Sequence, residues 1–275
     1  MNKQGRFLEF EGKIHRPKKH LGQNFLEDKN ILKKIADSVN LHSSESVIEI
    51  GPGKGALTEF LIQRTNRLKA IEVDNSLFEG LQKKFLNAEF ILGDFLEIEL
   101  ESFYKGEKLV VVGNIPYYIT TPIIFKLLEN WRFIDRAVLM IQDEVAKRLK
   151  AEPETKDYGI LAVQLQSFSE VSYLFQVGRK AFFPAPNVDS AVIELKFNPH
   201  PAIKKGEVDE KFYRNLIRNA FSMRRKTLLN NLKGKYDIDF FNESRMIDNK
   251  IDLSRRAETL TREEFILLSI NLAKK

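Results

Sequence analysis

Short apolar runs alternate with helix-like segments over the first 150 residues, and this alternation limits the folds open to the chain more than any other feature. The apolar runs have strand length and cover residues 46–50, 68–73, 89–92, 108–112 and 137–141. Segments with helical spacing precede and follow them, at residues 28–39, 56–64, 76–86, 121–130 and 143–150. Strands that alternate with helices in this way form βαβ units. We therefore expect an α/β fold with a parallel sheet covered by helices on both faces.

The chain changes character near residue 200. Two further strand-like runs, residues 171–177 and 191–197, come just before this point. We expect both to be extra strands near the end of the sheet, where an antiparallel orientation is open to them. The sequence Asn198-Pro-His-Pro201 then interrupts regular structure, and only helical spacing follows it. We expect a Rossmann-like domain over residues 1–200, which begins with a polar, basic and irregular arm of about 20 residues, and a helical domain over residues 201–275.

Positive charge is concentrated in the last quarter of the chain. The net charge is +6, and residues 201–275 hold 17 basic against 11 acidic residues, which accounts for all of it. Residues 211–235 contain eight basic residues and no acidic one, and a helix there would place Lys211, Arg214, Arg218 and Arg225 on one face. A solvated helix face normally mixes both signs, so a stripe of one sign indicates a polyanion, most simply nucleic acid. The candidate RNA contacts are Lys211, Arg214, Arg218, Arg224, Arg225 and Lys226, with a smaller N-terminal basic cluster at Lys13, Arg16, Lys18 and Lys19.

Composition excludes several other classes of protein. The chain has no cysteine, which rules out a disulfide framework and a thiolate nucleophile. Its four histidines are scattered, so we expect no metal site. No apolar run approaches the roughly 18 residues that cross a bilayer, and Glu9 and Glu11 argue against a transit peptide. We expect a cytoplasmic, monomeric protein without a membrane partner.

A glycine-rich loop, Gly51-Pro-Gly-Lys-Gly55, follows the first predicted strand and opens a helix. Such loops let a ligand approach the backbone and bind NAD, flavins or S-adenosyl-L-methionine, although some only make a tight turn. The spacing departs from the dinucleotide pattern G-x-G-x-x-G, and no G-x-x-x-x-G-K-[ST] motif is present. Gly51 and Gly53 are therefore candidate cofactor contacts, with a purely structural turn as the alternative.

Acidic residues end the next two predicted strands. Glu72 lies 17 residues after the last glycine of the loop, and a carboxylate there can accept hydrogen bonds from both hydroxyls of a ribose. Asp94 can accept from an adenine amino group, while Phe95 offers a ring or a backbone N–H. Glu72 taken alone also fits a plain strand-end charge. Because the carboxyl ends of parallel strands share one edge of a sheet, we expect these residues and the glycine loop to line one crevice.

The tetrapeptide Asn114-Ile-Pro-Tyr117 closes the fourth predicted strand and indicates chemistry on an amine. The exocyclic amine of adenine is a poor nucleophile, because its lone pair is delocalised into the ring. The Asn114 side-chain oxygen and a backbone carbonyl beside Pro116 can each accept one amine N–H, which aims the lone pair at a methyl group. Pro116 fixes the backbone, and Tyr117 offers a face on which a flipped base can stack. A plain Asn-x-Pro turn is the structural alternative.

A second aromatic candidate lies in Phe182-Phe-Pro-Ala-Pro186, where prolines keep the loop extended. An exposed ring in this loop can cover the other face of the base, whereas a buried ring would only pack in the core. We prefer Phe182 to Phe183 for the exposed position.

Together these motifs resemble the KsgA family of ribosomal RNA adenine dimethyltransferases. The resemblance runs in order from about residue 16 to the C-terminus. Its other motifs are Leu21-Gly-Gln-Asn-Phe-Leu26, Glu49–Thr58, Glu72-Val-Asp74, Thr121–Phe125, Phe182–Val192, Phe221–Leu228 and Arg256–Leu260.

The resemblance implies a Rossmann-like, S-adenosyl-L-methionine-dependent methyltransferase sheet with a small all-helical C-terminal domain. It also implies transfer of four methyl groups to two adjacent adenosines near the 3′ end of 16S (small-subunit) ribosomal RNA, in a partly assembled 30S subunit. Carried over by position, Asn24 and Leu26 would touch the cofactor, Gly51 would lie under its methionine part, and Asn114 would lie beside the methyl group. The family often has Asn where this chain has Tyr118, which leaves the stacking residue open.

Three rivals stand beside this interpretation. An Erm-type large-subunit RNA methyltransferase shares the Asn-Ile-Pro-Tyr motif, but Val188–Val192 and the basic Arg224–Lys226 segment favour the KsgA family. A ribosome assembly factor or transcription factor with a vestigial cofactor site is the non-enzymatic rival, and the intact Glu72, Asp94 and Asn114 argue against it. A nicotinamide oxidoreductase is disfavoured by the glycine spacing.

Overall fold

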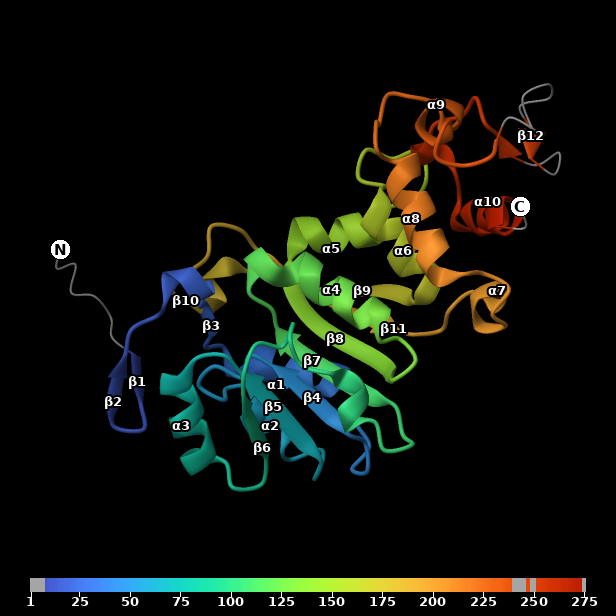
Figure 1. Ribbon diagram of the computed structural model, residues 1–275. Coiled ribbons are helices and arrows are strands. Elements are labelled where there is room, and N and C mark those ends of the chain that lie inside the picture. Colours follow the sequence, from blue (N-terminus) through green and yellow to red (C-terminus); the bar gives the residue numbers. More distant parts are fainter. Residues whose placement is uncertain (1–7, 239–245, 248–250, 274–275) are drawn as a thin grey trace. The chain divides into compact units, whose positions relative to one another are not determined.

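A seven-stranded sheet forms the centre of the fold, with strand order β6-β5-β4-β7-β8-β11-β9 (Figure 1). The computed structural model describes residues 8–238, 246–247 and 251–273. Strands β4–β8 all pair in parallel, whereas β11 runs antiparallel to β8. The predicted α/β class and parallel sheet are confirmed. The strands are β4 (Val47–Ile50), β5 (Leu68–Glu72), β6 (Glu89–Leu92), β7 (Leu109–Asn114), β8 (Ile134–Gln142), β9 (Glu170–Val177) and β11 (Ser190–Lys196).

The helices that precede, connect and follow the parallel strands lie where the apolar spacing predicts them. Aspartates begin two of them, because the Asp28 and Asp74 carboxylates accept from backbone N–H groups of the first helical turn. The apolar face of the first helix packs with Val110 and Val112 of β7 in one buried cluster. The helices are α1 (Lys29–Ser38), α2 (Thr58–Leu61), α3 (Asn75–Lys84), α4 (Thr120–Glu129) and α5 (Asp143–Leu149), with 3-10 turns at η1 (Lys19–Leu21), η2 (Leu100–Phe103), η3 (Tyr117–Ile119) and η4 (Arg179–Ala181).

The N-terminal residues are held by contacts that the sequence pattern does not reveal. β1 (Leu8–Phe10) and β2 (Lys13–His15) form a hairpin, and β3 (Phe25–Leu26) pairs with β10 (Phe182–Phe183). Phe10 is buried beside α3, and a β-carbon at Gly80 would lie only 2.3 Å from its ring. The expected irregular arm is therefore wrong for the described residues after 7. Strands of two or three residues are too short to show a period, so tertiary packing decides their place.

The chain divides into two compact units, Met1–Ala146 with Ser172–Lys196, and Lys147–Val171 with Phe197–Lys275. The structure differs here from a single division at residue 200, because α6 (Ile160–Phe168) belongs to the helical unit. That helix is apolar on nearly all sides, and its Ser167 hydroxyl lies 2.7 Å from the hydroxyl of the fully buried Tyr213. The same unit contains α7 (Pro201–Lys204), α8 (Glu210–Ala220), α9 (Leu228–Leu232), α10 (Arg262–Ala273), the 3-10 turn η6 (Ala257–Thr259) and a short pair of strands, β12 (Met246–Ile247) and β13 (Ile251–Asp252), which adds to the expected helices.

The glycine loop generates a stability prediction. Gly55 has a φ of 77°, and a β-carbon there would lie 2.2 Å from the ring of Phe85. We expect Gly55→Ala to lower the free energy of unfolding by about 2–5 kcal/mol, since it combines a left-handed backbone with an overpacked contact. Gly106→Ala is the matched control, because Gly106 has a φ of 95° and nothing within 4 Å of its would-be β-carbon. Urea unfolding of both variants measures the difference, and equal losses would contradict the packing account.

Candidate active site

A pocket of about 420 Å³ lies in the first unit, at the carboxyl ends of β4, β5 and β7. Nine of the residues singled out in the sequence line it, although they come from five separate segments. The structure therefore brings together the glycine loop, the acid of the second strand, the N-terminal segment and the Asn-Ile-Pro-Tyr loop. The nine residues are Asn24, Leu26, Gly51, Gly53, Glu72, Asn114, Pro116, Tyr117 and Phe182.

Glu72 is the carboxylate at the end of β5, and only 4% of its surface is exposed. Its two oxygens accept from two backbone N–H groups, those of Gly53 and Asp74, each at 2.9 Å. Burial raises the pKa of Glu72 to about 7, although both hydrogen bonds favour the charged form. Gly51 and Gly53 have φ values of 61° and 62°, which lets the loop turn its amides toward this carboxylate. Each oxygen retains acceptor capacity for a ligand hydroxyl.

Glu49 is a pocket residue that the sequence reasoning did not assign. It lies on β4 among Val47, Ile48 and Ile50, and its carboxylate is buried. One oxygen accepts from the Thr58 hydroxyl at 2.6 Å. Burial is the main reason that the pKa of Glu49 is raised to about 8. A charged residue inside an otherwise apolar strand was the available signal, because such a group is costly to bury without a function or a partner.

The Asn114 side chain is oriented by the N-terminal segment. Its amide nitrogen donates to the backbone carbonyl of Asn24 at 3.1 Å. Because the nitrogen is committed to a carbonyl, the side-chain oxygen is the end that can accept from an incoming amine. Asn24 in turn donates its own amide to the carbonyl of Gly22 at 3.1 Å. The arrangement therefore offers an oriented acceptor at the end of β7.

The two tyrosines after Pro116 have different surroundings. Tyr117 lines the pocket, and its hydroxyl lies 2.7 Å from the Ser190 hydroxyl at the start of β11. Partial burial raises the pKa of Tyr117, which keeps its hydroxyl neutral. Tyr118 is 58% exposed, and its ring lies against Gly22. Of the two, Tyr117 has the position from which a ring can face the pocket.

The preference for Phe182 as the exposed ring is wrong. Phe182 is only 5% exposed, because β10 pairs with β3 and buries this ring in the same cluster as Leu26. It contributes to the pocket wall as part of that core. Phe183 is half-buried and is not among the residues that line the pocket, so Phe182 stays the ring of this loop that borders it.

Asp94 and Phe95 follow β6, as expected, but they are not among the residues that line the pocket. Asp94 is exposed, and its carboxylate accepts from the backbone N–H of Leu96 at 2.8 Å. The Phe95 ring is buried, which leaves only its backbone groups for a ligand. Their expected contact with a cofactor base stays a prediction.

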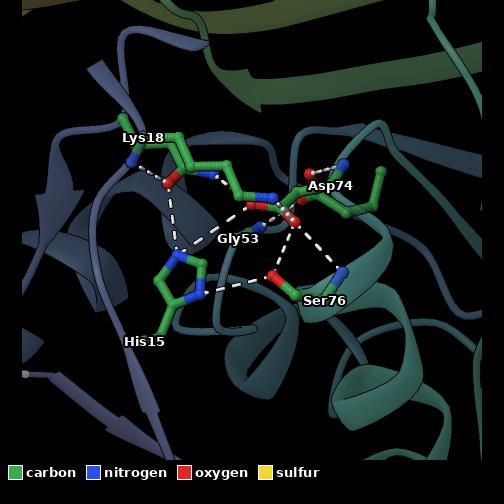
Figure 2. A network of polar contacts seen from close by, with 7 residues as sticks. His15, Lys18, Gly53, Asp74 and Ser76 are labelled. Atoms are coloured by element: carbon green, nitrogen blue, oxygen red, sulfur yellow. Dashed lines mark hydrogen bonds and ion pairs between the residues drawn. The ribbon is translucent and has the colours of Figure 1, made fainter. Parts of the chain in front are cut away.

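A polar network beside the pocket holds the N-terminal segment on the start of α3 (Figure 2). Its centre is the Asp74 carboxylate, which is fully buried and accepts from Lys18 Nζ at 2.6 Å and from the Gln23 amide at 2.9 Å. The Gln23 oxygen accepts from the Lys18 backbone N–H at 2.8 Å and lies 3.2 Å from His15 Nε2. These hydrogen bonds outweigh burial and lower the pKa of Asp74 to about 2. Lys18, counted above in a basic cluster, is thus paired with an acid.

The basic residues of the second unit do not form the single stripe expected on one helix. α8 ends at Ala220, before Arg225. Arg214 is only 9% exposed, because its guanidinium lies 4.7 Å from the centre of the Phe168 ring and 3.8 Å from Glu210. Arg214 follows the buried Tyr213 on the apolar side of the helix, so charge spacing alone was misleading. Arg224 is paired with Glu258 at 2.6 Å, whereas Lys211, Arg218, Arg225 and Lys226 are exposed.

Two kinds of feature are absent from the described residues. Among them, no group of three or more histidines, aspartates or glutamates could hold a metal ion. In the same part of the chain, none of the helices has both the length and the apolar character needed to span a bilayer.

The two buried carboxyls generate a pH prediction. The ordinary pKa of a glutamate carboxyl is 4.5, whereas in the folded chain the pKa of Glu49 is about 8 and that of Glu72 is about 7. The folded chain therefore binds more protons than the unfolded chain between pH 4.5 and pH 8. The free energy of unfolding should therefore fall as the pH rises from about 5 to 8, by at most ~1.4 kcal/mol per pH unit for each carboxyl. Glu49→Gln keeps the Thr58 hydrogen bond and should flatten this fall, as urea unfolding of the ligand-free protein at several pH values would detect. The exposed Glu101→Gln is the control, and an unchanged slope for Glu49→Gln would refute the burial account.

Comparisons with known proteins agree with the geometry. A family model described as "Ribosomal RNA adenine dimethylase" matches residues 14–274. A protein of Chlorobium phaeobacteroides (strain BS1) named "Ribosomal RNA small subunit methyltransferase A" is 48% identical over 251 residues, which cover 91% of this chain and 92% of the relative. The protein of that name from Bacillus cytotoxicus is 42% identical over 265 residues, 92% of this chain and 90% of its own length.

Solved structures give the same family. A dimethyladenosine transferase from Plasmodium falciparum superposes with a TM-score of 0.74 at 27% identity, covering 89% of this chain and 95% of that one. The 23S rRNA methyltransferase ErmE superposes with a TM-score of 0.68 at 28% identity, covering 91% of this chain and 100% of that one. The family expected from the motifs is thus confirmed, and a nicotinamide oxidoreductase is excluded. The chain belongs to the ribosomal RNA adenine dimethylase family.

Proposed function

We propose that this protein uses S-adenosyl-L-methionine to dimethylate two adjacent adenosines near the 3′ end of 16S ribosomal RNA, in a partly assembled 30S subunit. The family and the names of the relatives support the reaction and the small-subunit substrate. The observation that carries the proposal is the orientation of Asn114, whose amide nitrogen is bound to Asn24 and whose oxygen is left as an acceptor beside the pocket.

The pocket residues fit the cofactor chemically. S-adenosyl-L-methionine supplies an electrophilic methyl group on a positively charged sulfur when it is bound. Glu72 has two oxygens already fixed by backbone N–H groups, so it can accept from a ribose diol without reorganising. Glu49 adds a second buried carboxyl, which suits a cationic ligand in a pocket with apolar walls. Leu26 and the Gly51–Gly53 backbone line the same pocket.

Asn114 acts on the adenine amine. Its oxygen and a backbone carbonyl beside Pro116 each accept one N–H, which favours the more tetrahedral amine that attacks the methyl group. The amine becomes positively charged as the new C–N bond forms and the methyl–sulfur bond breaks with its electron pair left on sulfur, and these acceptors stabilise the charge on the amine. The proton then leaves to solvent, so no strong base is needed. Tyr117 stacks on one face of the flipped base, and Phe182 of β10 lines the same pocket.

The second unit supplies RNA affinity in this proposal. Arg218, Arg225, Lys226 and Lys211 are exposed and suit contacts with phosphates. Arg214 does not belong to this set, because it is buried. Arg224 is a less favourable candidate, because it forms an ion pair with Glu258.

Product mapping separates the proposal from its rivals. Labelled S-adenosyl-L-methionine is offered to small subunits that lack the modification and, in parallel, to unmodified large-subunit RNA, and the methylated positions are mapped by primer extension. We expect label only in two adjacent adenosines near the 3′ end of 16S RNA. Label in the large-subunit RNA alone would support an Erm-type enzyme, to which the ErmE superposition gives weight. RNA binding without any transfer would support a non-catalytic assembly factor.

Asn114→Ala should abolish methylation, because the amine loses its side-chain acceptor. The affinity for the cofactor should stay within about tenfold, or roughly 1.4 kcal/mol.

Glu72→Ala should behave in the opposite way and mainly weaken cofactor binding, by about 1.5–3 kcal/mol. Calorimetry and a turnover assay on both variants give the comparison. Near-normal turnover by Asn114→Ala would remove this residue from the reacting centre.

The double variant Arg225→Ala/Lys226→Ala should bind RNA with a weaker dependence on salt. Each lost phosphate contact should make the slope of log affinity against log salt shallower by roughly 0.7–0.9. Arg214→Ala is the control, because loss of its buried contacts should lower the melting temperature and leave the slope unchanged. If the double variant keeps the wild-type slope, the RNA contacts lie elsewhere on the protein.

A further inference from the structure

The segment Gly22–Leu26 lines the pocket and also contacts the Asn-Ile-Pro-Tyr loop. Asn24 and Leu26 line the pocket together with Glu72. The carbonyl of Asn24 holds the amide of Asn114, and Gly22 lies against the ring of Tyr118. A β-carbon at Gly22 would lie 3.1 Å from that ring, so the fit between the segment and the Asn-Ile-Pro-Tyr loop is close. A shift of the segment would therefore move the group that sets the Asn114 orientation.

The position of this segment depends on Gln23 and Lys18. The Gln23 side chain bridges two partners, because its nitrogen donates to Asp74 and its oxygen accepts from the Lys18 backbone. Lys18 Nζ bonds the other oxygen of Asp74 (Figure 2). The Asp74 side chain is fully buried, so its charge is not screened by water and needs these donors. We call Lys18, Gln23 and Asp74 the clasp.

The clasp also contacts Glu72, the residue proposed to bind the ribose of the cofactor. The Asp74 backbone N–H donates to one oxygen of Glu72, and Asp74 also begins α3 by accepting from the Ser76 N–H. A continuous path of contacts therefore runs from Glu72 through Asp74, Gln23 and Asn24 to Asn114. Its links are hydrogen bonds of 2.9–3.1 Å and one peptide bond.

We propose that Lys18, Gln23 and Asp74 are positioning residues for methyl transfer, which act through the Asn24 carbonyl on the amide of Asn114. The inference rests on the proposed role of Asn114. The clasp residues do not touch the reacting atoms; they hold the carbonyl that keeps the Asn114 oxygen available to the amine. Loosening the clasp allows the Asn114 amide to rotate and present its nitrogen, a donor, to an amine that needs an acceptor.

The test uses Gln23→Ala, Lys18→Met and Asp74→Asn in the full chain. Asp74→Asn keeps a helix-capping side chain but removes the charge that Lys18 requires. Asp28→Asn is its matched control, since Asp28 caps α1 by the same geometry without a clasp, and Lys83→Met, an exposed lysine of α3, is the control for Lys18→Met. The measurements are kcat and KM for the RNA substrate, melting temperature, and amide hydrogen exchange of the ligand-free protein.

We expect the clasp variants to lower kcat by about tenfold or more with little change in KM, because a small misplacement of an orienting group acts on the chemical step. Exchange should become faster in residues 18–27 and stay unchanged in the sheet. The double variant Lys18→Met/Asp74→Asn should be no worse than the more damaging single variant, since both break one ion pair. If Asp74→Asn does not fold, Gln23→Ala decides the question, because it leaves the helix cap intact.

Two results would overturn the inference. The first is faster exchange in residues 18–27 with an unchanged kcat, which would mean that the segment does not position Asn114. The second is a lower melting temperature with faster exchange throughout the first unit, which would give the clasp a purely structural role. Asn114→Ala keeps the two proposals apart. If that variant is inactive while the clasp variants are fully active, only the positioning inference fails, and if it is active, the assignment of Asn114 itself fails.

Discussion

Parallel pairing of β4 with β5 and β7 is the constraint on which the rest of the first unit depends. Parallel strands place their carboxyl ends at one edge, and the last residue of each strand or the one after it therefore lies near the others. Gly51, Glu72 and Asn114 occupy these three places. Helices follow the strands and cover the sheet, so the pocket at this edge has a rigid floor and can place polar groups accurately.

Burial of two carboxyl groups in the pocket costs electrostatic free energy. Glu49 and Glu72 are two buried carboxyls, and burial raises the pKa of both toward neutrality. Backbone donors to Glu72 and the Thr58 hydroxyl on Glu49 offset part of this cost. A cationic ligand would offset more, because an opposite charge in a poorly solvated pocket favours the ionised carboxylates. The chain thus gives up some stability for a site that suits a positively charged cofactor.

The N-terminal segment turns this pocket into an organised site. It is anchored at one end by β3, which pairs with β10, and at the other by the buried Asp74. Lys18 and Gln23 donate to the buried carboxylate from the N-terminal segment, and the Ser76 hydroxyl and backbone N–H donate to it from α3. The same segment supplies the carbonyl that orients Asn114. In the proposed function, cofactor binding and the orientation of Asn114 are therefore connected through one short piece of chain.

Sequence alone was sufficient for the sheet, its helices and the family, because these depend on local periodicity and on motifs at fixed strand ends. Glu72 and Asn114 could be assigned for the same reason, since a strand end determines its own position in a parallel sheet. The burial of Phe182 and of Arg214 could not be predicted, because it depends on β10 meeting β3 and on α8 meeting Phe168 across long stretches of sequence. The clasp on Asp74 was equally hidden, since Lys18 and Asp74 are 56 residues apart and each looks like a surface charge by itself. Tertiary structure decided these points, because burial and pairing arise only when distant segments pack together.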